Sequence, residues 1–154
     1  MNERDVPELL RLVRAIVSFE RGQDFSLNEA ELLRRGFGER PEFGAYVADV
    51  GPGSLAGMAV HHEIPFMHTL QPLLMLKWLY VDPECRGGRV GQRRMRQMAM
   101  HARATGHERF CWFVLNDNLL AQSFYRGLGA TDDPEWLRWI IPANALNRLV
   151  EGAE

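Results

Sequence analysis

Cysteine is scarce in this 154-residue chain, and no long stretch of it is apolar. The two cysteines, Cys85 and Cys111, form no C-x-x-C pair and no metal-binding spacing. A disulfide framework is therefore not expected, and a reducing cytoplasm suits the chain. No apolar run approaches ~18 residues, so the sequence predicts no transmembrane helix. The first residues carry charges and no apolar core segment, so no secretory signal is expected.

An excess of positive charge is also missing, since the formal net charge is -2. No global field therefore directs the protein toward nucleic acid or an anionic membrane. The apolar fraction of 46% and the charged fraction of 25% are close to globular averages. Without repeats, low-complexity tracts or a linker, the sequence predicts one domain over residues 1–154 that buries its own core.

Two helices open the predicted order of elements. Asp5 and Glu8 have the spacing of a capping box, and Pro7 suits a first helical turn. Apolar residues then recur at helical spacing. A second helix is expected from about Ser26 to Gly36.

Strand candidates follow the two helices. Residues 45–50 and 55–62 flank a Gly-Pro-Gly-Ser turn and predict a hairpin. Residues 73–81 are almost continuously apolar, which is typical of a strand buried on both faces. The rest of the chain predicts a helix over 90–105, a strand over 109–115, a helix over 118–128, a strand over 135–141 and a short helix within 142–154. This order indicates an α/β fold with a mixed sheet, an antiparallel meander leading into a parallel β-α-β unit.

A glycine-rich loop with two arginines joins the strand 73–81 to the next helix. It matches neither the Walker pattern nor G-x-G-x-x-G. Glycines let backbone N–H groups approach a ligand, and the helix start adds unpaired N–H groups with a partial positive charge. Arg86 and Arg89 add forked cationic donors. The loop therefore indicates a phosphate or pyrophosphate site, with a plain turn carrying solvated arginines as the alternative.

The loop also resembles a known family motif. Residues 81–91, VDPECRGGRVG, are similar to the acetyl-CoA loop of the GNAT superfamily of N-acetyltransferases. That loop has Arg or Gln at its first position and Gly or Ala at its last, where this chain has Arg86 and Gly91. Arg89 stands where the family usually has glycine, and from there it could form a direct salt bridge to the pyrophosphate.

A second motif lies at the family's usual distance. Asn118, Ala121 and Tyr125 resemble the N-x-x-A-x-x-x-Y helix of the family, followed by its Leu-Gly-Ala. The spermidine/spermine and thialysine acetyltransferases are the most similar subgroup, over roughly residues 5 to 141. The family normally opens with a strand before its first helix, and that strand is missing here, either lost or preceding the recorded start.

The resemblance implies a GNAT fold and the direct transfer of an acetyl group from acetyl-CoA to a primary amine of a small molecule. It implies no metal and no covalent enzyme intermediate. The pantetheine arm would lie between strands 73–81 and 109–115, and Tyr125 would protonate the leaving thiolate, because a phenol with a pKa of ~10 is a donor at neutral pH. The cofactor-binding residues implied are Leu79, Tyr80, Val81, Arg86, Gly87, Gly88, Arg89, Val90, Gly91, Gln92, Asn118 and Tyr125.

The acceptor site carries one departure from the polyamine enzymes. They usually have a carboxylate in this strand at the position of Lys77. We expect Lys77 and its neighbour Trp78 to face the acceptor site, which favours an amino-acid-like amine over a polyamine. An edge lysine that reaches into water is the alternative. Glu63, Asp82 and Glu84 are the carboxylates left to take the amine's proton, and Glu63, acting through water, is preferred.

Rival functions remain for comparison. His61, His62 and His68 have no metal-binding spacing, and adjacent strand residues point to opposite faces, so no metal site is expected. A local cluster of arginines leaves a nucleic-acid-binding module as one alternative, against the negative net charge. A non-catalytic acyl-CoA sensor is another. The expected partners are acetyl-CoA and a small amine, with no nucleic acid and no membrane, and the expected assembly is a cytoplasmic homodimer paired through the C-terminal strands.

Overall fold

The computed structural model describes residues 1–20, 26–65 and 71–152 of the chain. The chain divides into two compact units, Met1–Asp117 and Asn118–Glu154, and each is described by itself. The expectation of a single domain over the whole chain stays a prediction.

The first unit opens with a short 3-10 helix, η1 (Glu3–Asp5), that leads into α1 (Val6–Phe19). The predicted helix start is confirmed, but its predicted capping box is wrong. The box lies one turn earlier than expected: the side chain of Asp5 accepts from the Asn2 N–H at 2.7 Å, and the side chain of Asn2 accepts from the backbone of the following turn. The Glu8 carboxylate accepts hydrogen bonds from the side chain of Arg11 and from the N–H of Leu55, so it does not cap α1.

The second helix, α2 (Glu29–Phe37), begins three residues later than the sequence suggests. The side chain of Asn28 accepts a hydrogen bond of 2.9 Å from the N–H of Glu31, so Asn28 is the N-cap. The predicted start at Ser26 is therefore wrong, and the helix runs one residue beyond the predicted end at Gly36. An asparagine cap competes well with a serine cap, which explains the difference.

Four strands form one mixed sheet in the order β1-β2-β3-β4. The strands are β1 (Gly44–Gly51), β2 (Ser54–Ile64), β3 (Leu73–Val81) and β4 (Phe110–Cys111). β1, β2 and β3 pair antiparallel, whereas β3 and β4 pair parallel, so the predicted meander and parallel unit are confirmed. The strand expected over 109–115 is much shorter than predicted, because only two of its residues pair with β3.

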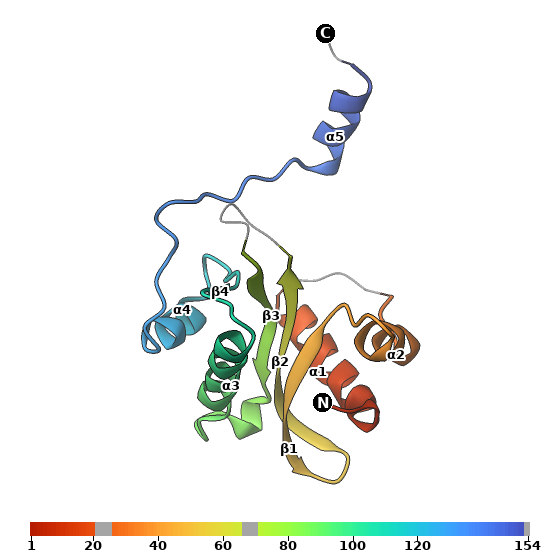
Figure 1. The fold of residues 1–154 in the computed structure, drawn as a ribbon, viewed down its shortest axis with the longest axis vertical. Coiled ribbons are helices and arrows are strands. Elements are labelled where there is room, and N and C mark those ends of the chain that lie inside the picture. The colour runs from red at the N-terminus through yellow and green to blue at the C-terminus, as the bar shows by residue number, and fades with distance from the viewer. Residues whose placement is uncertain (21–25, 66–70, 153–154) are drawn as a thin grey trace. The chain divides into compact units, whose positions relative to one another are not determined.

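Helices cover both faces of the sheet in the first unit. Figure 1 shows α1 and α2 on one face and α3 (Val90–Ala104) on the other. The amphipathic side of α1 buries its leucines and valines against Met58 and Val60 of β2, which forms the main core. α3 ends as predicted at Gly106, whose φ of 77° is accessible at low cost only to glycine.

The second unit contains α4 (Leu119–Arg126) and α5 (Ala143–Val150), which confirms the two helices expected there. The strand predicted over 135–141 is wrong, since those residues have no regular secondary structure. A strand needs a neighbour for its backbone groups, and the described part of this unit contains no other strand. The apolar residues of this segment therefore lie on an irregular chain.

Candidate functional site

The two parallel strands of the sheet part almost as soon as they pair. Leu74 lies opposite Phe110 and Met75 opposite Cys111, and the register ends there. β3 continues to Val81, so residues 76–81 have no pairing partner on β4. Unpaired strand edges offer N–H and C=O groups to an extended ligand. The backbone of Leu79, Tyr80 and Val81, which the family resemblance assigns to acetyl-CoA, lies in this open stretch.

A β-bulge marks the beginning of the open stretch. Val60 of β2 pairs with Trp78, but the next residue, His61, pairs with Leu76. Lys77 is therefore an extra residue on β3 with no partner across the ladder. Bulges redirect side chains and end regular pairing, and they are common beside active sites.

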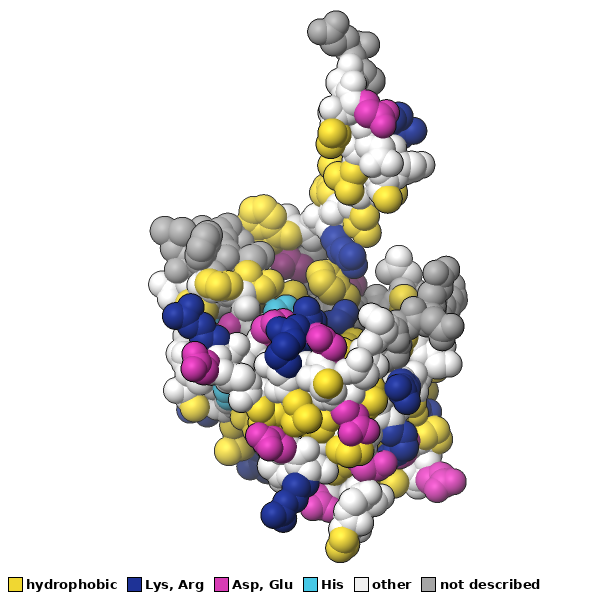
Figure 2. Space-filling model, turned by 90° about the vertical axis from the view of Figure 1, so that its right-hand side faces the viewer, with side chains coloured by type: hydrophobic (Ala, Val, Ile, Leu, Met, Phe, Trp, Pro, Cys, Tyr) yellow, Lys and Arg dark blue, Asp and Glu magenta, His cyan; other side chains and the backbone are white. Residues whose placement is uncertain are grey.

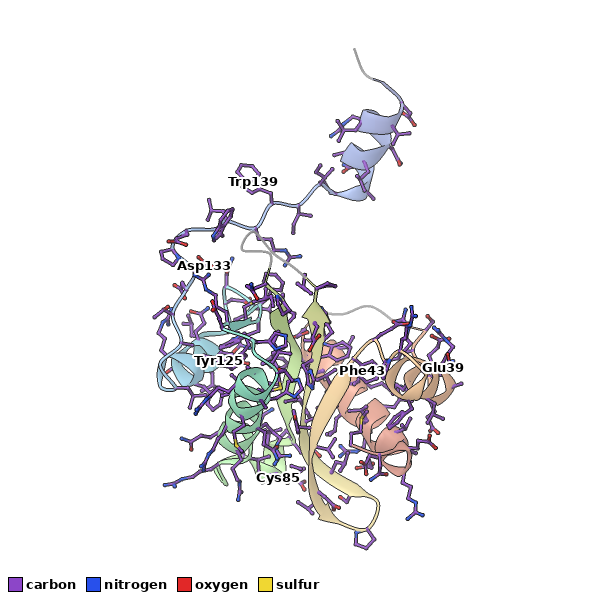
Figure 3. The ribbon with its side chains drawn as sticks, in the orientation of Figure 1. Glu39, Phe43, Cys85, Tyr125, Asp133 and Trp139 are labelled. Atoms are coloured by element: carbon purple, nitrogen blue, oxygen red, sulfur yellow. The ribbon has the colours of Figure 1, made fainter. Side chains whose placement is uncertain are left out.

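The open strand runs directly into the glycine-rich loop. A 3-10 turn, η2 (Pro83–Cys85), follows β3, and the loop leads into α3. Figure 3 labels Cys85 at this end of the sheet. Gly87 has a φ of 81°, and Arg89 has a φ of 58°, the left-handed conformation. The family resemblance places glycine at position 89, and the backbone explains that preference, because a side chain there costs about 1 kcal/mol.

The positive end of the α3 dipole meets no capping side chain and no acidic residue in the first turn of the helix. Its N-cap makes no side-chain hydrogen bond, and its first turn contains no acidic residue. The helix therefore presents unpaired N–H groups and the positive end of its dipole. Two guanidinium groups support the loop: Arg86 donates to the Val81 carbonyl at 3.1 Å, and Arg93 donates to the Gly88 carbonyl at 2.7 Å. Such a terminus suits a phosphate or pyrophosphate.

One member of the local arginine cluster serves the fold; the cluster consists of Arg86, Arg89, Arg93, Arg94 and Arg96. Arg94 donates a hydrogen bond to the Val47 carbonyl of β1, and burial lowers the pKa of its guanidinium. Arg93 is likewise bonded to the loop backbone. The cluster is therefore less of a free cationic surface than the sequence suggests.

The side chain of Lys77 is exposed and lies over the ring of Trp78, with its Nζ 5.2 Å from the ring centroid. Both residues interact with Glu20, which follows the last turn of α1. Burial raises the pKa of the Glu20 carboxyl, against the lowering effects of the Lys77 charge and a hydrogen bond from Trp78. A cation, an indole and a carboxylate thus meet beside the bulge.

Sequence reasoning missed Glu20. Acidic residues that directly follow an amphipathic helix are common on protein surfaces. The sequence therefore carried no signal that pointed to Glu20. Only the packing of α1 against β3 brings the carboxylate to Trp78.

The three carboxylates proposed as proton acceptors have different surroundings. Glu63 lies at the end of β2 with 54% of its side chain exposed, 3.5 Å from the Nε2 atom of His107. Asp82 forms an ion pair of 2.9 Å with Arg11, which also bonds Glu8 and the Leu55 carbonyl. That network holds α1 to the end of β3, so Asp82 has a structural role. Glu84 is exposed on η2.

Asn118 and Tyr125 belong to the second unit and are described within it. The Oδ1 atom of Asn118 accepts a hydrogen bond of 3.1 Å from the Ala121 N–H and caps α4. A contact from Asn118 to an acyl carrier would therefore use its amide nitrogen. Tyr125 is half-buried on α4, with its ring edge-on to Phe124 at 5.2 Å between centroids (Figure 3).

No group of three histidine, cysteine or acidic side chains suited to a metal ion occurs in residues 1–20, 26–65 and 71–152. His68 lies outside the described residues. Within the same ranges, no helix is long and apolar enough to cross a membrane.

Residues 10–130 match the acetyltransferase (GNAT) family. A thialysine N-epsilon-acetyltransferase of Mus musculus is 30% identical to the chain, with 96% of this chain and 92% of that protein covered. The Sus scrofa protein of the same name is 32% identical, with 89% and 85% covered. Among solved structures, an aminoglycoside acetyltransferase from an uncultured soil metagenomic sample, in complex with sisomicin, has a TM-score of 0.74 at 17% identity, with 92% of each chain covered. The fold, the family match over most of the chain and these relatives together establish that this protein belongs to the acetyltransferase (GNAT) family and is an N-acetyltransferase.

Proposed function

We propose that this enzyme transfers the acetyl group of acetyl-CoA directly to a primary amine of a small, amino-acid-like molecule. One observation carries the proposal: the stretch of β3 without a β4 partner leads, through η2 and the glycine-rich loop, into the uncapped N-terminus of α3. Proteins of the GNAT family use acetyl-CoA as co-substrate, and the names of two relatives specify thialysine, an amine that is also an amino acid.

The residues present suit the donor. The backbone of Leu79 and Val81 would bond the extended pantetheine arm, and the N–H of Tyr80 or a neighbour would stabilise the oxyanion. The loop from Arg86 to Gln92 would hold the pyrophosphate, and the amide of Asn118 would fix the arm near the thiol. The acyl donor supplies an activated thioester, while the protein supplies position and a polarised carbonyl.

The acceptor would occupy the region around the bulge. An amino acid carries both a carboxylate and an ammonium group, and Lys77 and Glu20 offer one charge of each sign. The ring of Trp78 between them would pack against the aliphatic part of the substrate. A polyamine has no group for Lys77, so it should be the poorer acceptor.

The proton steps divide between two groups. Tyr125 would give its phenolic proton to the leaving thiolate, and the proton that the nitrogen loses after attack, as the amide forms, would restore the phenol. A primary amine is mostly protonated at neutral pH and must lose a proton before attack. We propose Glu63, through water, as the acceptor of that proton, with Glu20 as the second carboxylate to test. No enzyme nucleophile takes part.

The decisive experiment assays a panel of amines for release of free coenzyme A. We expect thialysine and lysine to exceed spermidine in kcat/KM for the wild type. Lys77→Glu should reverse that order by about tenfold or more, since it exchanges the charge that distinguishes the substrates. Equal preference in both proteins would refute the proposed role of Lys77.

A substitution of Tyr125 distinguishes an enzyme from a non-catalytic acyl-CoA sensor. For an enzyme, Tyr125→Phe should lower kcat by about 10- to 100-fold while the dissociation constant for acetyl-CoA stays the same. Acetyl-CoA binding without any amine-dependent release of coenzyme A from the wild type would favour the sensor. A nucleic-acid-binding module would instead show a steep salt dependence for nucleic acid and no thermal shift with acetyl-CoA.

We also propose that the protein is a homodimer that buries its C-terminal segment, residues 136–150, against a second copy. Apolar side chains gather along this segment (Figure 2), and Trp139 is 88% and Leu137 83% exposed. With about 150–250 Å² for each large side chain, the exposed apolar area is roughly 1,000 Å². That suffices for a standard interface, which needs about 800 Å² on each partner.

Analytical ultracentrifugation tests the assembly. Trp139→Asp should shift the wild-type dimer toward monomer, because it places a charge in the apolar surface. Ser123→Asp introduces the same charge at an exposed position of α4, outside this segment, and should leave the dimer intact. A wild type that is monomeric at micromolar concentration would exclude this interface. The cytoplasmic location stays a prediction.

A further inference from the structure

One guanidinium on α1 bonds three separate parts of the first unit. Arg11 donates to the Glu8 carboxylate on its own helix and to the Leu55 carbonyl at the start of β2, 2.9 Å away. It also donates to both carboxylate oxygens of Asp82, the residue that follows β3, at 3.2 Å and 2.9 Å. Glu8 completes the network by accepting from the Leu55 N–H at 3.2 Å.

The bond between Arg11 and Asp82 fixes a direction as well as a distance. A guanidinium carries its N–H donors in a rigid planar fork, and two of them meet the two oxygens of this carboxylate. The side chains are 44% and 23% exposed, so the charges by themselves contribute little in solvent. The orientation of the Asp82 carboxylate is therefore the main effect of the bond.

The backbone of Asp82 is held on two further sides. Its N–H donates to the Ala56 carbonyl of β2 at 2.9 Å. Its carbonyl accepts from the Cys85 N–H at 2.9 Å, and this bond closes the turn η2. Asp82 is therefore the point at which the chain leaves the sheet and begins its turn toward the glycine-rich loop.

The bond from Asp82 to β2 also tells which way the preceding backbone groups face. In an antiparallel ladder, the residues that bond one neighbouring strand alternate with residues that face the other side. Because Asp82 bonds β2, the N–H and C=O groups of Val81 and Leu79 face the opposite edge, where β3 has no β4 partner. Asp82 thus lies between that open edge and the loop.

Acetyl-CoA would use both of these surfaces in the proposed function. Its pantetheine arm would lie along the open edge of β3, and its pyrophosphate would lie in the loop from Arg86 to Gln92. Two linked contacts reinforce each other only when the geometry lets both form at once. The chain between the two surfaces turns at Asp82, and Arg11 holds that residue from α1.

We propose that Arg11 is a positioning residue for the acyl donor: it holds Asp82 so that the open edge of β3 and the glycine-rich loop receive one molecule of acetyl-CoA together. This role is additional to the attachment of α1 to the end of β3, and it requires no contact between Arg11 and the donor. The inference rests on the proposed function in one respect, that acetyl-CoA occupies both the edge and the loop.

Two probes test this role in titration calorimetry. Acetyl-CoA spans both surfaces, whereas acetyl-pantetheine lacks the nucleotide and its phosphates and uses the edge alone. For Arg11→Met we expect the dissociation constant of acetyl-CoA to rise about 3- to 10-fold, as for the loss of one modest hydrogen bond, while that of acetyl-pantetheine stays the same.

Two further variants serve as controls. Arg11→Lys should recover part of the affinity for acetyl-CoA, because an ammonium group still bonds Asp82 but has no planar fork. Arg34→Met removes a similar ion pair, 2.9 Å from Glu31 on α2, and should bind both probes as the wild type does. A lower melting temperature of Arg11→Met with unchanged affinity for acetyl-CoA would overturn the proposal. An equal loss for both probes would also overturn it, since the defect would then lie in the edge itself.

Hydrogen exchange gives a measurement that needs no ligand. The Cys85 amide, which bonds the Asp82 carbonyl, should exchange faster in Arg11→Met than in Arg34→Met when each is compared with the Met58 amide in the core. If no protein binds acetyl-CoA, the proposed function fails, and exchange at Cys85 then decides the role of Arg11. Equal relative rates in the two variants would refute that role.

Discussion

Acid should destabilise this protein through His61, and replacing that residue by phenylalanine should remove much of the effect. The ring of His61 stacks on Tyr46 with centroids 5.7 Å apart and lies 4.7 Å from His101. It covers Gly44, where an added Cβ would come within 2.6 Å of Nε2. Burial, together with the charges of the neighbouring histidines, lowers the pKa of His61 to about 4.

The direction of the effect follows from proton linkage. An unfolded histidine has a pKa of ~6.5, so the unfolded chain binds a proton at this residue below that pH. In the folded chain His61 binds the proton only below about pH 4. Stability therefore falls as the pH drops through this window. Between about pH 7.5 and about pH 5 the linkage relation gives about 2 kcal/mol, and solvent screening at a partly exposed ring reduces it to about 1 kcal/mol.

Urea denaturation followed by tryptophan fluorescence measures this difference. His61→Phe keeps an aromatic ring that cannot be protonated, so its loss of stability between the two pH values should be smaller than that of the wild type by about 1 kcal/mol. Any packing cost of phenylalanine shifts both values equally and cancels. His62→Gln removes one of the charges that lower the pKa of His61, so it should reduce the acid sensitivity by less than His61→Phe does. Equal acid sensitivity of wild type and His61→Phe would refute the reasoning.

Two further substitutions test the frame and the loop. Arg11→Met removes the guanidinium that joins α1 to Asp82 and to the Leu55 carbonyl, and we expect the free energy of unfolding to fall by about 1–2 kcal/mol in urea denaturation; a change below about 0.3 kcal/mol would contradict that role. Arg89→Gly removes the strain of a side chain in the left-handed conformation, so the free energy of unfolding should stay equal or rise by up to about 1 kcal/mol. The loss of one charge should weaken acetyl-CoA binding by about 3- to 10-fold. Unchanged affinity would mean that position 89 serves only the turn.

Local chemistry in the sequence predicted the regular elements well. Continuous apolar character located β3, and a hairpin turn located β1 and β2 within two residues at each end. Gly106 correctly marked the end of α3. The errors arose where two local signals competed, as at the start of α2, where Asn28 rather than Ser26 caps the helix. The strand predicted over residues 135–141 was also wrong, because a run of apolar residues does not supply a partner strand.

By itself the sequence determined the residue types that the chemistry needs and the order in which they occur: the glycine-arginine loop after a buried strand, and the helix that carries Asn118 and Tyr125. The tertiary structure alone decided which of these groups meet. The bulge at Lys77, the meeting of Glu20 with Trp78, and the contact between His107 and Glu63 each depend on strand register and on how helices pack against the sheet. Those relations join residues far apart in the chain, so no local pattern of side chains encodes them.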